Sequence, residues 1–231
     1  DSLIVDKWAQ HENWYFDQNT MSGKNLSEEE INSLNPNKNY YWRVRYRDRS
    51  LTWSSWSDII SFQTKPSTLT SNLLANEGAE NGTSSWVETA GAFESIQSGD
   101  CGGNNAFAGS HLFAVGGVCE NHPYGEGYQL IDVSSSNTEI DNDSISVLYG
   151  GYLSDFNGND IPSFKLEFYN SNNALISATP ISSNQSPSWT SINKEYLVPS
   201  ETRSIRFVLR GTRNSGSDND SFFDNLYLML D

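Results

Sequence analysis

The chain has 231 residues, of which 36% are hydrophobic and 13% aromatic, and it carries a formal net charge of −15 at pH 7. A negative field of this size disfavours nucleic acids and anionic membranes, so we expect no nucleic acid partner. No apolar run approaches the roughly 20 residues of a spanning helix, and we expect no membrane insertion. The opening at Asp1 lacks a basic-then-apolar signal segment and predicts a processed or cut start.

Short aromatic and β-branched runs alternate with polar turns along most of the chain. Beyond residue 71 these runs are YQLIDV, ISVLYGGYL, FKLEFYN, SIRFVLRG and SFFDNLYLML. The segments between them, such as NSNNA and RNSGSDND, have turn compositions. Regularly spaced short strands predict an all-β protein made of sandwiches, and the one helix-like stretch is SEEEINSL at 27–34.

The segment KPSTLTS at 65–71 separates two strand-rich regions. A proline among small polar residues is typical of a linker. We therefore predict a first domain at 1–66, a linker at 67–71 and a second domain at 72–231.

In the first domain, alternation along YYWRVRY sorts the side chains onto two faces. The apolar face, predicted to enter the core, carries Tyr40, Trp42, Val44 and Tyr46. The opposite face carries the arginines, and WSSWS begins the next antiparallel strand, so its tryptophans can cover the guanidinium planes. The predicted structural ladder consists of Arg43, Arg45, Trp53 and Trp56. A surface for an anion or a protein partner is the alternative.

The spacing of Leu34, Pro36 and Tyr40 resembles the tyrosine corner of a fibronectin type III domain. The segment YYWRVRYRD with WSSWS resembles the endings of fibronectin-like domains in bacterial surface proteins. It is also similar to the WSXWS box of cytokine receptors, although the paired cysteines of those receptors are missing. The corner tyrosine belongs late in such a domain, so the resemblance implies a partial fibronectin III sandwich that lacks its first strands.

The second domain holds both cysteines, Cys101 and Cys119. Its Asn/Ser/Thr/Gly-rich composition looks secreted, and we predict a disulfide, with two buried free thiols as the alternative. The three histidines show no metal-ligand spacing, which makes a zinc site or a thiol nucleophile a poor hypothesis. Because neither a G-x-S-x-G motif nor an identifiable acid–base carboxylate pair is present, we predict that the chain is not an enzyme.

Three segments of the second domain carry a further resemblance: NLLANEGAENGTSSW at 72–86, GSHLFAVGG at 109–117 and SFFDNLYLML at 221–230. They resemble carbohydrate-binding modules with a galactose-binding-like β-jelly roll. In that family the two ends of the domain meet, commonly around a structural calcium ion.

The resemblance implies a calcium site at matching positions of this chain. Glu80 and Asp224 would supply carboxylates, and backbone carbonyls near Asn76, Gly109 and His111 would complete the shell. Calcium takes six to eight oxygen ligands of mixed kind, which suits this set. The alternative is that Glu80 and Asp224 cap turns or meet solvent. Two acidic segments, SDFNGND at 154–160 and SDND at 217–220, give a weaker indication of a second cation.

Strand alternation also predicts a ligand-binding face in the second domain. If the strands share a sheet, the outward side chains are Tyr152, Lys165, Glu167, Tyr169, Arg206 and Arg210. An aromatic ring beside charged hydrogen-bonding groups suits a sugar, whose CH face stacks and whose hydroxyls bond. A solvated face with cross-strand ion pairs is the alternative. Tyr124, Phe156 and Trp189 could supplement or replace this face.

The resemblance implies a non-catalytic carbohydrate-binding region of a larger secreted or cell-surface multidomain protein, with the fibronectin-like domain as a spacer. The expected partner is a polysaccharide or glycan, with other domains of the parent polypeptide as further partners. The alternative is a structural or adhesion module that makes protein–protein or interdomain contacts without binding sugar. A receptor ectodomain has only WSSWS in its favour.

Overall fold

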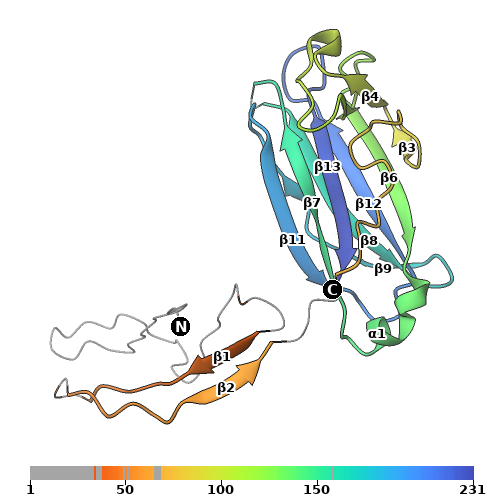
Figure 1. Cartoon of the computed structure of the whole chain (residues 1–231). Helices are drawn as coiled ribbons and strands as arrows, with labels where there is room; N and C mark the ends of the chain where they lie inside the picture. The colour runs from red at the N-terminus through yellow and green to blue at the C-terminus, as the bar shows by residue number, and fades with distance from the viewer. Residues whose placement is uncertain (1–33, 35–37, 49, 51, 65–68, 158) are drawn as a thin grey trace. The chain divides into compact units, whose positions relative to one another are not determined.

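The computed structural model describes residues 34, 38–48, 50, 52–64, 69–157 and 159–231. The chain divides into two compact units, Asp1–Ser67 and Thr68–Asp231, which are described separately (Figure 1). The division falls inside the segment 65–71. The helix-like stretch at 27–33, the corner residue Pro36 and the question of missing first strands lie outside the described residues.

The described part of the first unit is an antiparallel hairpin of β1 (Asn39–Trp42) and β2 (Ile60–Gln63). Beyond β1 the two segments stay paired, because the backbone N–H of Ser54 donates to the Tyr46 carbonyl and that of Ser57 to the Val44 carbonyl. The hydroxyls of the same serines accept the N–H groups of Tyr46 and Val44, at 3.1 and 3.0 Å. The serines of WSSWS therefore substitute for ladder bonds and hold the strands in register.

The outward arginines stack on the tryptophans in the predicted ladder. The Arg43 guanidinium lies 4.4 Å from the Trp56 ring, and Arg45 lies 4.3 Å from Trp53 and 4.4 Å from Trp56. Arg47 extends the ladder at 5.2 Å from Trp53. An exposed contact of this kind contributes about 0.5–1 kcal/mol, so the ladder stiffens the hairpin.

The prediction that Trp42, Val44 and Tyr46 enter a core is wrong for the described hairpin. Their exposed fractions are 44%, 55% and 72%, while Tyr40 is half-buried and stacks on Phe62. A strand face is buried only where a second layer packs against it. Within the described residues, this hairpin has two strands and no such layer.

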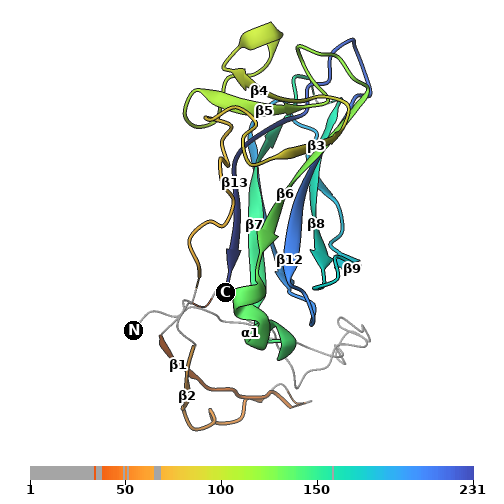
Figure 2. The same cartoon turned by 90° about the vertical axis from the view of Figure 1, so that its right-hand side faces the viewer.

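The second unit is a sandwich of two antiparallel sheets, which confirms the all-β prediction (Figures 1 and 2). The six-stranded sheet has the order β10-β8-β12-β6-β3, with β9 paired to β8. Its strands are β3 (Val87–Ala90), β6 (Tyr124–Asp132), β8 (Ile161–Tyr169), β9 (Leu175–Ala178), β10 (Ser182–Ser183) and β12 (Ser204–Thr212). The five-stranded sheet has the order β11-β7-β13-β5-β4. Its strands are β4 (Phe93–Gln97), β5 (His111–Val115), β7 (Ser146–Ser154), β11 (Thr190–Leu197) and β13 (Phe222–Leu230).

Helical structure in the described residues is limited to η2 (Asp100–Gly102), η3 (Ser134–Ser136) and α1 (Asn137–Asp141). In both views α1 lies at one end of the sandwich and β4 at the other (Figures 1 and 2). Across the described part of the chain, the structure contains no helix with the length and apolarity to cross a bilayer.

Alternate side chains of the predicted strands form the main core. The fully buried members include Phe164, Leu166 and Phe168 of β8, Ile205, Phe207 and Leu209 of β12, and Phe223 and Leu228 of β13. Trp86 lies among Phe93, Phe113 and Phe207, with ring centroids 5.6, 5.2 and 6.3 Å away. The inward pattern read from period-two alternation is therefore the one that the two sheets bury.

The two ends of this unit meet along β13. The Asn72 side chain accepts the Leu228 N–H at 2.9 Å and donates to the Leu226 carbonyl at 2.9 Å. The N–H groups of Thr70 and Leu73 donate to the carbonyls of Leu230 and Leu228. The opening segment thus lies beside the last strand, as the jelly-roll resemblance implies.

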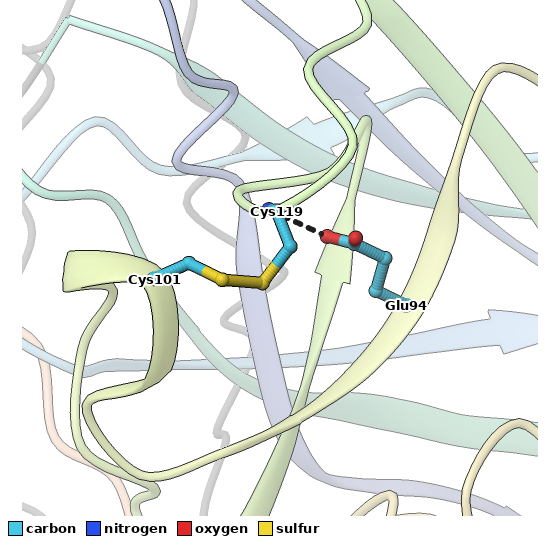
Figure 3. Close-up of a disulfide and its surroundings, with 3 residues drawn as sticks. All are labelled: Glu94, Cys101 and Cys119. Atoms are coloured by element: carbon cyan, nitrogen blue, oxygen red, sulfur yellow. Dashed lines mark hydrogen bonds between the residues drawn. A yellow bond between two sulfur atoms is a disulfide. The ribbon is translucent and has the colours of Figure 1, made fainter.

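A second, small core lies on the five-stranded sheet, and a disulfide joins Cys101 to Cys119 in the same unit (Figure 3). The core contains Ile96, Leu112, Ala114, Val118 and Phe222. Cys101 belongs to η2, and the Cys119 N–H donates to Oε2 of Glu94 on β4 at 3.1 Å. The predicted disulfide is confirmed, and it ties the turn after β5 to the segment that follows β4.

Candidate functional site

Five of the six predicted ligand-binding residues share the outer face of the six-stranded sheet. Lys165, Glu167 and Tyr169 come from β8, and Arg206 and Arg210 come from β12. The register places Arg206 opposite Glu167 on one side and Leu130 of β6 on the other. These side chains therefore form one continuous surface.

Arg206 lies between two tyrosine rings at the centre of this surface. Its guanidinium carbon is 4.3 Å from the Tyr128 ring and 4.6 Å from the Tyr169 ring. Its Nη1 donates to the Tyr169 hydroxyl at 3.2 Å, and that hydroxyl donates to Oε2 of Glu167 at 2.7 Å. The Nε of Arg206 is buried and has no hydrogen-bond partner among the described residues. A buried donor of this kind is commonly satisfied by water or by a ligand.

Ion pairs and hydrogen bonds occupy much of the remaining surface. Lys165 pairs with Glu167, and both side chains are 15% exposed. Arg210 Nε donates to Oε2 of Glu126 at 2.7 Å, and the Tyr124 hydroxyl donates to the same carboxylate at 2.7 Å. Burial, together with that bond, raises the pKa of Tyr124 to about 12. The face therefore presents aromatic rings and fixed hydrogen-bonding groups, with its charges largely paired.

Tyr152 does not belong to this surface. It was predicted to join the other five residues only if all their strands shared one sheet. It lies in β7 of the five-stranded sheet, where it stacks on Phe107. Sheet membership depends on strand pairing across the chain, which alternation within one strand does not reveal.

The surface also contains Tyr128 and Glu126, which sequence reasoning did not select. Both come from the segment YGEGYQ, where outward side chains alternate with inward glycines Gly125 and Gly127. That alternation of large polar and aromatic residues with glycine was the available signal. Of the loop aromatics, Tyr124 joins this face, and Phe156 is 49% exposed in a separate loop.

A pocket of about 290 Å³ lies where the opening segment meets β13. It is lined by Asn76, Glu77, Gly78, Glu80, Asn81, Ala108, Gly109, Asp224 and Asn225. The two carboxylates predicted as calcium ligands therefore lie at one site, although 144 positions separate Glu80 from Asp224 in the sequence. Asn76, Ala79 and Asn225 have φ values of 53°, 61° and 47°. Such left-handed, non-glycine backbone is energetically costly and concentrates at functional sites.

Glu80 is held by the loop before β5. Its Oε1 accepts the N–H groups of Ser110 and His111 at 2.7 and 2.9 Å, and its Oε2 accepts the Ser110 hydroxyl at 2.9 Å. The bonds from His111 and Ser110 lower the pKa of Glu80 to about 2. Gly109 fits here because an added Cβ would lie 2.1 Å from Oε1 of Glu80. His111 thus orients Glu80 through its N–H, and it is not among the residues that line the pocket.

Asp224 is fully buried on the other side of the pocket. Its Oδ2 accepts the Ala108 N–H at 2.9 Å and its Oδ1 accepts the Asn225 N–H at 2.6 Å. Burial raises the pKa of this carboxyl, and the nearby charge of Glu80 acts in the same direction, against the lowering effect of the backbone bonds. A bound cation would relieve both unfavourable effects.

The oxygens of this pocket suit a hard cation, although some of them already accept hydrogen bonds. Oε1 of Glu80 already accepts two N–H groups, which leaves Oε2 and the Asp224 carboxylate as the anionic oxygens for a cation. Among the described residues, the Asn76 carbonyl accepts only the Trp86 indole N–H, at 3.3 Å. No group of three or more His, Cys, Asp or Glu side chains suited to a metal ion occurs in the described part of the chain. A cation here would therefore need backbone carbonyls beside the two carboxylates, which calcium accepts.

The two acidic segments that gave a weaker indication of a second cation lie together in loops at one end of the sandwich. Asp155 and Asp160 are buried, and Asp160 accepts the N–H groups of Asn214 and Asp220 at 2.8 and 2.9 Å. Burial and the charges of Asp160, Asp218 and Asp155 raise the pKa of Asp220 to about 6. The two acidic segments SDFNGND and SDND are thus brought together, but they form no ligand set for a metal in the described residues.

The raised pKa of Asp220 predicts a pH-dependent effect of the Asp220→Asn variant. The folded state keeps the proton up to about pH 6, whereas an unfolded Asp loses it near 3.8, so charging Asp220 weakens the fold above that window. We expect the variant to melt roughly 2–4 °C higher at pH 7.5, a screened effect of about 1 kcal/mol. In thermal melts with EDTA, the difference in melting temperature between the variant and the wild type should vanish below pH 4. An equal difference at both pH values would contradict this account.

Comparisons with known proteins found one family model and several similar solved structures. Residues 2–66 match a family model described as "Rha78A-like, N-terminal immunoglobulin domain". No curated protein matched the chain.

Three similar solved structures are carbohydrate-binding modules with low sequence identity. A Family 16 Carbohydrate Binding Module-2 has 17% identity and a TM-score of 0.48, covering 68% of this chain and 99% of its own. TmCBM61 in complex with beta-1,4-galactotriose has 16% identity and a TM-score of 0.46, covering 69% and 98%. The CBM22-1 xylan-binding domain from Paenibacillus barcinonensis Xyn10C has 12% identity and a TM-score of 0.43, covering 67% and 91%.

Proposed function

We propose that the second unit is a non-catalytic module that binds polysaccharide on the outer face of its six-stranded sheet. The observation that carries the proposal is the position of Arg206 between Tyr128 and Tyr169, with its Nε buried and unpaired. A sugar ring can pack its CH face on the tyrosines while its hydroxyls bond to the guanidinium and to Glu167. Pairing of the charges favours recognition of hydroxyl groups over bulk attraction to a charged polymer.

We propose that the first unit is a spacer with fibronectin type III character. Its arginine–tryptophan ladder and the serine hydroxyls of WSSWS hold the two segments of the hairpin together, which supports a structural role. The disulfide of the second unit favours an oxidising compartment, and a secreted or cell-surface location is proposed on that ground. Other domains of the parent polypeptide are the expected covalent partners of this spacer.

The pocket at the junction of the domain ends is proposed to hold a structural calcium ion. Glu80 and Asp224 would contribute carboxylate oxygens, with carbonyls around Asn76 and Gly109 completing the shell. The ion would offset the burial of Asp224 and join the opening segment to β13. Its removal is therefore expected to affect stability.

The binding proposal is tested by replacing Arg206 with alanine. Native affinity electrophoresis or calorimetry with a panel of soluble polysaccharides, including xylan and galactan, measures the affinity. Because a hydrogen bond to a charged group is worth about 1.5–3 kcal/mol, we expect Arg206→Ala to weaken binding more than about tenfold.

The matched control is Arg203→Ala. Arg203 belongs to the same unit and pairs with Asp141 at 2.7 Å, outside the proposed face, so its loss should leave affinity unchanged. Equal losses in both variants would contradict the proposed site. A wild-type protein that no polysaccharide retards would favour the alternative, a structural or adhesion module.

A further inference from the structure

The outer face of the five-stranded sheet carries a second group of aromatic side chains. Arg206 lies on the outer face of the other sheet, on the opposite side of the sandwich. Three strands contribute to it, since the register aligns Asn193 of β11, Gly150 of β7 and Tyr227 of β13. In the next row, Ser191, Tyr152 and Asp224 are aligned in the same way. The aromatic platform is defined here as Phe107, Tyr152 and Tyr227.

Tyr227 lies across the sheet above Gly150. Its hydroxyl donates to Oδ1 of Asn193 at 2.8 Å, so the side chain spans β7 from β13 to β11. A Cβ added at Gly150 would lie 2.9 Å from the Tyr227 hydroxyl and 2.0 Å from the Ile192 carbonyl oxygen. Only glycine leaves room for the Tyr227 side chain to cross β7 in this way.

Phe107 is held in the platform by contacts with its neighbours. Its ring stacks on Tyr152 with centroids 3.5 Å apart and planes 16° apart, and Phe107 itself remains 42% exposed. Trp189 contacts the same ring edge-on at 6.3 Å and donates its indole N–H to the Asn105 carbonyl. The next residue, Ala108, is held by Asp224. Phe107 is therefore fixed in position before any ligand arrives, which reduces the ordering cost of binding.

Uncharged polar groups border these rings on the β11 side, whereas Asp224, aligned with Tyr152, is fully buried. Asn193 is exposed, and its Oδ1 accepts from both Tyr227 and Ser191, at 2.8 and 3.2 Å. Its Nδ2 makes no hydrogen bond within the described residues and faces solvent as a donor. None of the three rings or of these two bordering residues carries a charge at neutral pH, in contrast to the paired ions around Arg206.

We propose that the platform is a second carbohydrate-binding site, one that takes the pyranose rings of a neutral polysaccharide. The exposed Phe107 ring and the half-buried Tyr152 and Tyr227 rings offer stacking surfaces for the CH faces of a sugar. The Asn193 amide and the Ser191 hydroxyl offer hydrogen bonds to its hydroxyl groups. Because the two sites lie on the outer faces of opposite sheets, one module can contact two chain segments and gain avidity on long polymers.

The experiment uses the full chain and the variants Phe107→Ala and Tyr227→Ala, with Phe156→Ala as the control. Phe156 is a phenylalanine outside the platform whose exposed fraction, 49%, is similar to the 42% of Phe107. Affinity electrophoresis in xylan, galactan and glucomannan measures binding, and thermal melts show that each variant is folded. We expect each platform variant to bind at least about tenfold more weakly, a loss of roughly 1.4 kcal/mol, and the control to bind as the wild type does. Asn193→Ala, an exposed polar change, supplies a second readout if an aromatic variant fails to fold.

The outcomes separate this inference from the proposed function. Loss in Phe107→Ala or Asn193→Ala with binding retained in Arg206→Ala supports the platform and removes the six-stranded face as the main site. Loss in Arg206→Ala alone overturns the platform and leaves the proposed function intact. Partial loss in each, with full loss in the double variant, supports both sites. Absence of binding by the wild type to all three polymers overturns both.

Discussion

Chelation of calcium is expected to lower the melting temperature of the second unit by roughly 8–16 °C. A ligand that binds only the folded state stabilises it by about 4 kcal/mol when present at 1,000 times its Kd. In a unit of this size, 1 kcal/mol corresponds to roughly 2–4 °C. The effect should be large because Glu80 belongs to the first loop of the unit and Asp224 to its last strand. Both line one pocket and bond the segment before β5, so the ion would add a direct link between the ends of the domain.

The measurement compares thermal melts of the full chain in EDTA and in excess calcium. Asp224→Asn should melt at the same temperature in both solutions, because the buried ligand is lost. Asp132→Asn is the matched control, since Asp132 lies outside the pocket and its carboxylate bonds only Ser134 among the described residues. It should keep the full calcium response. Wild-type melts that coincide in the two solutions would remove the metal proposal.

Replacement of both cysteines by serine is expected to destabilise the second unit by about 3 kcal/mol. The disulfide joins residues 18 positions apart, and closing a loop of that length removes about this much conformational free energy from the unfolded chain. The corresponding fall in melting temperature is roughly 6–12 °C. Gly103, two residues after Cys101, also lies close to Ile96 and Phe222 of the small core.

A reducing agent provides the control for this prediction. Reduction of the wild type should lower its melting temperature to that of Cys101→Ser/Cys119→Ser, whereas the double variant should not respond. Glu94→Gln keeps the disulfide and weakens only the bond to the Cys119 N–H, so it should melt close to the wild type. A wild type that melts identically with and without reductant would show that the crosslink contributes little.

Strands with a clear inward and outward pattern were predictable from the sequence. In SIRFVLRG, the apolar residues Ile205, Phe207 and Leu209 alternate with Arg206, Val208 and Arg210, and the structure buries the first set completely. In FKLEFYN the same pattern holds for β8. The local period of two is enough here, because one face of each strand packs against the other sheet.

Elements with weak patterns were missed. β11 reads TSINKEYL, and only Ile192 and Tyr196 of this edge strand pack on the core, so its polar composition resembles a loop. The short helix α1 is stabilised by tertiary contacts at Ile140, which is fully buried. Propensity over five residues is too weak to predict such a helix.

Long-range pairing accounts for the main errors at the candidate site. Tyr152 is outward as predicted, but its strand pairs with β11 and β13, which places it on the opposite sheet from Arg206. The stack of Tyr152 on Phe107 and the span of Tyr227 across Gly150 depend on the same pairing. No feature within one strand indicates which strand will lie beside it.

The sequence by itself predicted the all-β class and the inward and outward faces of the long strands of the second unit, and it favoured the arginine–tryptophan ladder and the Cys101–Cys119 disulfide over their alternatives. These features follow from local alternation, or from the presence of only two cysteines. The tertiary structure alone decided which faces share a sheet, how Arg206 sits between two tyrosines, and that Trp42 and Val44 are exposed in the described hairpin. The physical reason is that burial and side-chain contacts depend on the layer that packs against a strand, and a strand's own residues do not specify that layer.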